Sequence, residues 1–119
     1  MNRLIVLRHA KAAQVPGSAD AERPLTERGE RDAGRAGRVL RELGLVPDLV
    51  LCSPSVRTRR TAELVLAELA PAAPVEYERE IYEAYADDLL ELVRRTDPEV
   101  RTLLLVGHNP GVHELTRLL

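Results

Sequence analysis

The sequence has 119 residues, of which 45% are hydrophobic and 30% charged, and its formal net charge is −2. This size suits one compact domain with a single core better than two domains that would each lack buried area. The nearly balanced charge excludes a global basic field of the kind that attracts nucleic acid or an anionic membrane, so any anion site has to be local.

The first predicted element is a buried strand at residues 4–7, an apolar run that ends abruptly at Arg8 and His9. The run is too short for a signal peptide or a membrane span. Small and polar residues from 12 to 23 predict a loop long enough to fold over a site. Thr26 then caps a predicted helix whose apolar spacing continues until Gly44 stops it.

A second strand is predicted at residues 49–52, again as a continuous apolar run. Residues 53–55 form a turn and a cap for the next helix, which we expect to end at Pro71 and Pro74. A short strand at residues 75–77 follows. The second predicted strand is thus followed by a helix, as the first one is.

The last third of the chain begins with residues 80–83, which we expect to be irregular, and an amphipathic helix at residues 87–95. Residues 103–106 show a third buried-strand pattern, and Gly107 leads into a helix that runs to Leu119. Strands that alternate with helices predict an α/β fold, a three-layer sandwich with a mainly parallel sheet. Ligands bind such sheets outside the carboxyl ends of the strands.

Three predicted strand ends carry polar residues that together form a cationic site. Arg8 and His9 follow the first strand, Arg57 lies one turn beyond Ser53 of the second, and His108 follows the third. A phosphoryl dianion is bound well by guanidinium forks, imidazole donors and a helix N-terminus, and this set offers all three. It contains no metal-ligand cluster, so we expect neither a metal nor a cofactor.

His9 is the candidate nucleophile of this set. Imidazole attacks only in its neutral form, and the positive charges of two neighbouring arginines bias the pKa of a histidine downward. A lone pair is therefore available on His9 at neutral pH.

These residues resemble the motifs of the histidine phosphatase superfamily, whose fold is that of phosphoglycerate mutase. Residues 7–11 resemble its R-H-G signature, with Ala10 where glycine is commoner. Residues 23–29 are similar to R-P-L-T-x-x-G, residues 53–61 to S-P-x-x-R-x-x-x-T, and residues 106–110 to the second-histidine motif. Four motifs in the right order are far more specific than any one of them.

Within the superfamily, the short length and the R-H-A-K opening are most similar to SixA-type phosphohistidine phosphatases. The resemblance implies a single histidine phosphatase domain over residues 1–119. It also implies that this domain lacks a C-terminal strand and helix, because SixA-like proteins usually continue with both.

The resemblance assigns a role to each residue of the cationic site. It implies that His9 attacks phosphorus, that Arg8 and Arg57 bind the phosphoryl oxygens, and that His108 donates to the same group. Water then hydrolyses the phosphohistidine. Arg23, at the end of the flexible loop, is expected to reach the phosphate from above.

An alkoxide leaving group also needs a proton. Glu83 lies roughly where the superfamily has its acid, and Glu80 is the competing choice. An imidazole leaving group from phosphohistidine has a weaker bond to phosphorus, so it demands less of an acid.

The composition indicates the cellular compartment and the class of partner. The single cysteine, Cys52, forms no internal disulfide and has no partner for a zinc cluster, which favours a reducing, cytoplasmic compartment. The only aromatic residues are three tyrosines, so stacking platforms for bases are scarce. We expect a phosphorylated protein or a small phosphorylated molecule as partner, and neither nucleic acid nor a membrane.

The sequence thus predicts a metal-independent phosphatase that acts on phosphohistidine of a signalling protein. A phosphatase for a small phosphorylated metabolite is the first alternative, and a non-catalytic phosphate-binding module is the second. A mutase is a third, but the short insert between Val75 and Asp87 argues against the closed pocket that a mutase needs.

Overall fold

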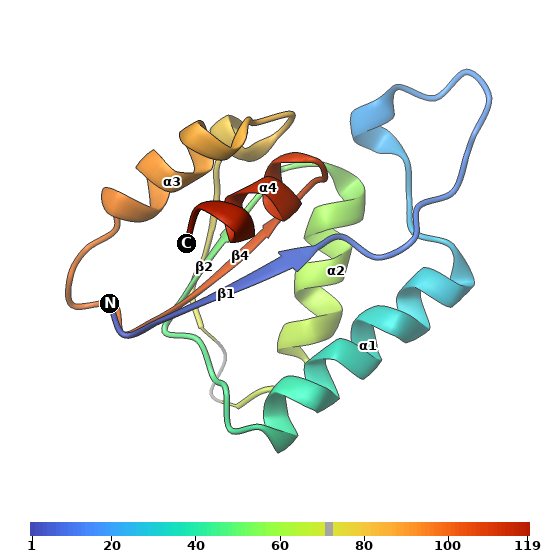
Figure 1. Cartoon of the computed structure of the whole chain (residues 1–119). Coiled ribbons are helices and arrows are strands. Elements are labelled where there is room, and N and C mark those ends of the chain that lie inside the picture. Colours follow the sequence, from blue (N-terminus) through green and yellow to red (C-terminus); the bar gives the residue numbers. More distant parts are fainter. Residues whose placement is uncertain (71–72) are drawn as a thin grey trace.

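The computed structural model describes residues 1–70 and 73–119, and its centre is a parallel sheet with strand order β1-β4-β2-β3 (Figure 1). The strands are β1 (Arg3–Arg8), β2 (Leu49–Cys52), β3 (Val75–Tyr77) and β4 (Thr102–Gly107). All neighbouring pairs run parallel. The carboxyl ends of the strands therefore lie along one edge of the sheet, where the predicted site residues follow β1, β2 and β4.

Helices cover both faces of the sheet, which confirms the predicted three-layer α/β architecture (Figure 1). The helices are α1 (Glu27–Glu42), α2 (Val56–Leu66), α3 (Ala86–Arg94) and α4 (Gly111–Leu118), with short 3₁₀ helices η1 (Asp20–Glu22) and η2 (Arg79–Ile81). Helices α1 and α2 pack together on one face, and α3 and α4 on the other. None of the helices in the described residues is both long and apolar enough to cross a membrane.

Strand β4 is the centre of the core, because it is buried along its whole length. Its side chains alternate between the two faces, as the pleat of a strand requires. Leu103 and Leu105 belong to the apolar cluster under α3 and α4, while Leu104 and Val106 belong to the cluster under α1 and α2. An aliphatic core on both sides thus fixes the strand that leads to His108.

Two predicted helix caps and one predicted stop are confirmed. The hydroxyl of Thr26 accepts a hydrogen bond from the Gly29 amide at the start of α1, and that of Ser55 accepts from the Thr58 amide at the start of α2. Gly44, just after α1, has φ = +70°, a left-handed conformation that favours glycine.

Some expectations need correction. Strand β1 was expected to be buried on both faces, but residues 4–7 are half-buried because β1 pairs only with β4, at the edge of the described sheet. Helix α2 ends at Leu66, before the prolines expected to end it, and Pro71 lies outside the described residues. Residues 80–83 are not wholly irregular, since η2 covers part of them.

The R-P-L-T-x-x-G segment fastens the loop that follows β1. The Thr26 amide donates to the Lys11 carbonyl at 2.9 Å, and the Ala13 amide donates to the Pro24 carbonyl at 2.8 Å. Gly29 is buried directly against the Lys11 backbone, so closely that a Cβ at this position would overlap the Lys11 carbonyl oxygen. The glycine of this motif is therefore required by close backbone packing two residues from His9.

We predict opposite effects for two glycine-to-alanine substitutions in α1. Gly29→Ala should lower the free energy of unfolding by about 1–3 kcal/mol, because the new methyl group forces the Lys11 backbone away. The matched control Gly34→Ala has only a side-chain atom of Arg38 at 3.5 Å and should stabilise the helix by about 1 kcal/mol. Urea denaturation measures both, and equal effects of the two substitutions would contradict the packing role of Gly29.

Candidate active site

His9 is held in one tautomer by its own chain. Its Nδ1 lies 2.7 Å from the Ala10 carbonyl oxygen, which can only accept a hydrogen bond, so Nδ1 carries the proton. The lone pair of the neutral ring is then on Nε2. Burial lowers the pKa of His9, and the charges of Arg57, Arg8 and Arg23 lower it further, against the opposing effect of the Ala10 carbonyl.

Thr61 fixes the backbone beside His9. Its hydroxyl accepts a hydrogen bond from the Ala10 amide at 3.0 Å and donates to the Arg57 carbonyl at 2.7 Å. Thr61 is buried, so water does not compete for these bonds. The last residue of the S-P-x-x-R-x-x-x-T segment thus ties the His9 loop to α2, a positioning role that the sequence alone did not reveal.

Arg57 supplies a buried guanidinium at the start of α2, with 6% of the residue exposed. Its Nη1 donates to the Asp20 backbone carbonyl at 2.6 Å, and its Nη2 donates to Asp20 Oδ2 at 2.9 Å. Its Nε is buried and has no hydrogen-bond partner within residues 1–70 and 73–119. An arginine that is buried and incompletely satisfied is suited to receive a further anionic ligand.

His108 takes the opposite tautomer to His9. Its Nδ1 lies 3.3 Å from Nη2 of Arg57, which can only donate, so Nδ1 accepts, and its Nε2 donates to the Ser53 hydroxyl at 2.7 Å. Burial and the charges of Arg57 and His9 lower the pKa of His108 to about 4. Donation from Nδ1 to a phosphoryl oxygen therefore requires His108 to take up a proton.

This pKa also affects stability. An unfolded histidine takes up its proton near pH 6.5, whereas folded His108 does so only near pH 4. Between these values the unfolded state binds more protons, so the free energy of unfolding falls as the pH drops through this window.

The Asp20 carboxylate lies among the cations of the site. It accepts hydrogen bonds from Arg57 and from the hydroxyl of Tyr82, and its Oδ1 accepts from Arg23 Nη1 at 3.0 Å. The Tyr82 hydroxyl and the two guanidinium groups hold the pKa of Asp20 far below its usual range. The sequence predicted that this loop folds over a site, but it did not single out Asp20 or Tyr82.

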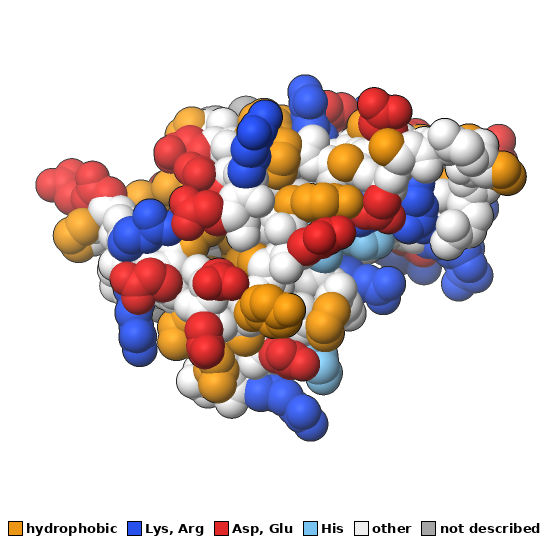
Figure 2. Space-filling view, turned by 90° about the horizontal axis from the view of Figure 1, so that it is seen from above, with side chains coloured by type: hydrophobic (Ala, Val, Ile, Leu, Met, Phe, Trp, Pro, Cys, Tyr) orange, Lys and Arg blue, Asp and Glu red, His pale blue; other side chains and the backbone are white. Residues whose placement is uncertain are grey.

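The two histidine rings lie next to each other, with centroids 5.3 Å apart and planes tilted by 59°, and Tyr82 meets His108 edge-on at 5.2 Å. Figure 2, a view from above, shows histidine side chains at the surface among acidic and basic ones. The expected convergence of the three strand ends is therefore observed, with Tyr82 as an additional wall.

Two hollows flank this centre. One, of about 370 Å³, is lined by Arg8, His9, Lys11, Ala12 and Arg23 and contains no acidic side chain in its lining. The other, also about 370 Å³, is lined by Asp20, Arg57, Glu83, Ala84, Tyr85, His108, Asn109 and Pro110. Arg8 and Arg23 thus lie on the His9 side, and Glu83 lies on the His108 side.

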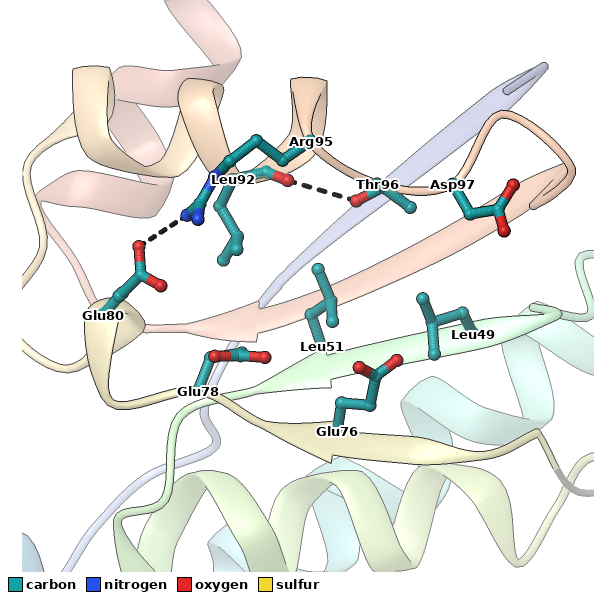
Figure 3. A pocket seen from close by; sticks show the side chains of 9 residues that line it. All are labelled: Leu49, Leu51, Glu76, Glu78, Glu80, Leu92, Arg95, Thr96 and Asp97. Atoms are coloured by element: carbon teal, nitrogen blue, oxygen red, sulfur yellow. Dashed lines mark hydrogen bonds and ion pairs between the residues drawn. The ribbon is translucent and has the colours of Figure 1, made fainter.

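The structure separates the two candidate acids. Glu83 is exposed in the hollow beside His108, on a backbone with φ = +57°. Glu80 instead forms an ion pair with Arg95 of 2.6 Å and lines a different pocket, on the α3 side of β2 (Figure 3). Of the two, only Glu83 lies beside the cationic site.

No group of three or more histidine, cysteine, aspartate or glutamate side chains suited to a metal ion occurs within the two described stretches, residues 1–70 and 73–119.

Comparison with known families and proteins identifies the architecture. The profile of the histidine phosphatase superfamily (branch 1) matches residues 4–108, nearly the whole chain. The chain belongs to this superfamily. It is 42% identical over 113 residues to the uncharacterized protein Rv1276c of Mycobacterium tuberculosis, a match that covers 95% of this chain and 69% of that protein.

Solved structures of the superfamily are also similar. A proposed phosphohistidine phosphatase, SixA of Agrobacterium tumefaciens, has a TM-score of 0.91 at 32% identity over 97% of this chain and 74% of its own. A protein histidine phosphatase SixA in complex with tungstate has a TM-score of 0.84 at 28% identity, over 95% of this chain and 73% of its own. The expected phosphoglycerate mutase-like, SixA-like fold is thereby confirmed.

The position of Arg57 against His108 predicts a charge effect that titration can detect. Arg57→Met removes one positive charge, so the pKa of His108 should rise above about 4, while burial keeps it below 6.5. Histidine NMR titration measures this pKa. The matched control Arg59→Met, on the exposed side of α2, should leave the value unchanged, and an unchanged value in Arg57→Met would refute the coupling.

Proposed function

We propose that this superfamily member is a metal-independent phosphatase that forms a phosphohistidine on His9 and acts on phosphohistidine of a signalling protein in the cytoplasm. The observation that carries the proposal is the tautomer of His9, because its Nδ1 proton is engaged by the Ala10 carbonyl. Nε2 is thereby left as a free lone pair beside guanidinium groups.

In the first step, Nε2 of His9 attacks phosphorus, the bond from phosphorus to the leaving group breaks, and a proton goes to the leaving group. The transferred group remains strongly anionic throughout, so prearranged cations supply most of the stabilisation. Arg57 and Arg8 bind its oxygens, and Arg23 joins them from the loop. Loss of one such donor should slow the step by about 10²–10³-fold, by analogy with an oxyanion-hole donor.

In the second step, water attacks phosphorus and gives a proton to the carboxylate that protonated the leaving group, the bond from phosphorus to Nε2 breaks, and phosphate leaves His9 neutral again. Glu83 is the group we assign to proton transfer on the leaving-group side, because it lines the hollow next to His108 and Arg57. An approaching dianion raises the pKa of His108, which lets the ring take up a proton and donate to a phosphoryl oxygen.

Two similarities support a phosphohistidine substrate. One SixA protein is a proposed phosphohistidine phosphatase, and the other is a protein histidine phosphatase that binds tungstate, a tetrahedral oxyanion like phosphate. In addition, Glu83 is exposed, and an exposed acid is adequate for an imidazole leaving group. Small phosphomonoesters remain the alternative substrates, and relative rates decide between the two classes.

The central test follows phosphate release in EDTA from a phosphohistidine protein and from p-nitrophenyl phosphate, together with acid-labile labelling of the enzyme by ³²P. Wild type should release phosphate from both and become labelled, whereas His9→Ala should do neither, because it lacks the nucleophile. His113→Ala, at an exposed position of α4, is the matched control and should behave like wild type. If folded wild type releases no phosphate, the protein is a binding module instead.

Two matched substitutions, Glu83→Gln and Glu80→Gln, test the assignment of Glu83 as the acid. Glu83→Gln should slow hydrolysis of an alkyl phosphate such as glycerol phosphate by about 10²-fold, the lower end of what general acids contribute. It should slow phosphohistidine hydrolysis much less. Glu80→Gln should leave both rates unchanged, because Glu80 pairs with Arg95 elsewhere. Steady-state kinetics with both substrates checks this, and equal losses in the two variants would exclude Glu83 as the acid.

A further inference from the structure

The carboxylate of Asp20 occupies the place that an anionic substrate needs. We propose that Asp20 is an internal competitor for the phosphoryl group, which sets the affinity of the site for anions and helps product phosphate to leave. This inference rests on the proposed function, because it takes the cationic site to be the phosphoryl site.

The contacts of Asp20 are those that a phosphoryl group would make. One carboxylate oxygen accepts from Nη2 of Arg57 at 2.9 Å and from the Tyr82 hydroxyl, and the other accepts from Arg23 at 3.0 Å. The same Nη2 of Arg57 also contacts His108. An anion that uses these same donors of Arg57 and Arg23 has to displace this carboxylate.

The loop that carries Asp20 is fastened to the rest of the molecule through this residue. Among the hydrogen bonds of the described chain, those that join residues 14–22 to other segments all end on Asp20. Figure 1 shows the loop between β1 and α1 projecting away from the sheet. The loop is therefore freed from the site only when both the Asp20 carboxylate and the Asp20 backbone carbonyl, which accepts from Nη1 of Arg57 at 2.6 Å, leave their partners.

Arg57 and Asp20 differ in burial in a way that favours replacement of the Asp20 carboxylate by an anionic ligand. The side chain of Arg57 is 7% exposed, whereas that of Asp20 is 48% exposed. A buried guanidinium is costly to leave without an anion, but a carboxylate at the surface regains water when it moves out. Asp20 thus neutralises Arg57 between turnovers and yields to a dianion, which brings more charge and more acceptor atoms.

Competition of this kind has a quantitative signature. If the open site is populated only in part, every anion that must displace Asp20 loses affinity by the same factor. Asp20→Asn keeps the shape but removes the charge, so inorganic phosphate and tungstate should both bind more tightly, by an equal factor of roughly ten. Tyr82→Phe removes one hydrogen bond to the Asp20 carboxylate and should give a smaller gain in the affinity for both anions.

The experiment measures the Kd of inorganic phosphate and of tungstate by calorimetry for wild type, Asp20→Asn and Tyr82→Phe. The matched control is Glu22→Gln on the same 3₁₀ helix, whose side chain makes no hydrogen bond in the described structure; it should bind as wild type does. Thermal unfolding of each variant confirms that it is folded.

Two results for Asp20→Asn would overturn the proposal: an unchanged Kd or a higher Kd. An unchanged Kd together with slower turnover of poor leaving groups would mark Asp20 as an acid. The same comparison of Asp20 with Asp20→Asn in a His9→Ala background, which cannot be phosphorylated, separates this inference from the proposed function. Tighter phosphate binding by Asp20→Asn, together with no turnover by wild type, would support the competitor and reject the phosphatase.

Discussion

The buried guanidinium of Arg57 is the constraint on which the site depends. A charge that is nearly excluded from water needs an anion or strong acceptors around it, and the structure supplies Asp20 on one side and the lone pair of His108 on the other. These partners in turn fix the loop above the site and the ring beside it. One residue at the start of α2 thus organises segments that are far apart in the chain.

The sheet makes that organisation possible. Because the strands run parallel, the chain arrives at the same edge after β1, β2 and β4, and the residue after each strand points into a common space. Close backbone approaches then set the finer positions. Gly29 packs against Lys11, close to His9, the proposed nucleophile. Gly111 packs so closely against Ala84 that a side chain there would displace the turn that carries Glu83.

Much of this could be read from the sequence, for identifiable reasons. Continuous apolar runs predicted the strands and placed His9 and His108 just after two of them, because burial is a local property of the pattern. The contact between Asp20 and Tyr82 could not be predicted, since it joins residues 62 positions apart and no local pattern distinguishes one loop aspartate from another. The choice between Glu83 and Glu80 likewise needed the structure, because an exposed turn has no periodicity that tells which side chain faces the site.

The two histidines are not interchangeable, and the reason lies in their partners. The Ala10 carbonyl oxygen accepts from Nδ1 of His9, so the lone pair of His9 is on Nε2. The Arg57 guanidinium donates to Nδ1 of His108, so the proton of His108 is on Nε2. In the reaction that we propose, His9 attacks as a neutral ring, whereas His108 becomes a donor only after negative charge arrives beside it. On this proposal, the entering anion creates one of its own donors, and that donor loses its proton again when the anion leaves and Asp20, as the internal competitor that we propose, returns to Arg57.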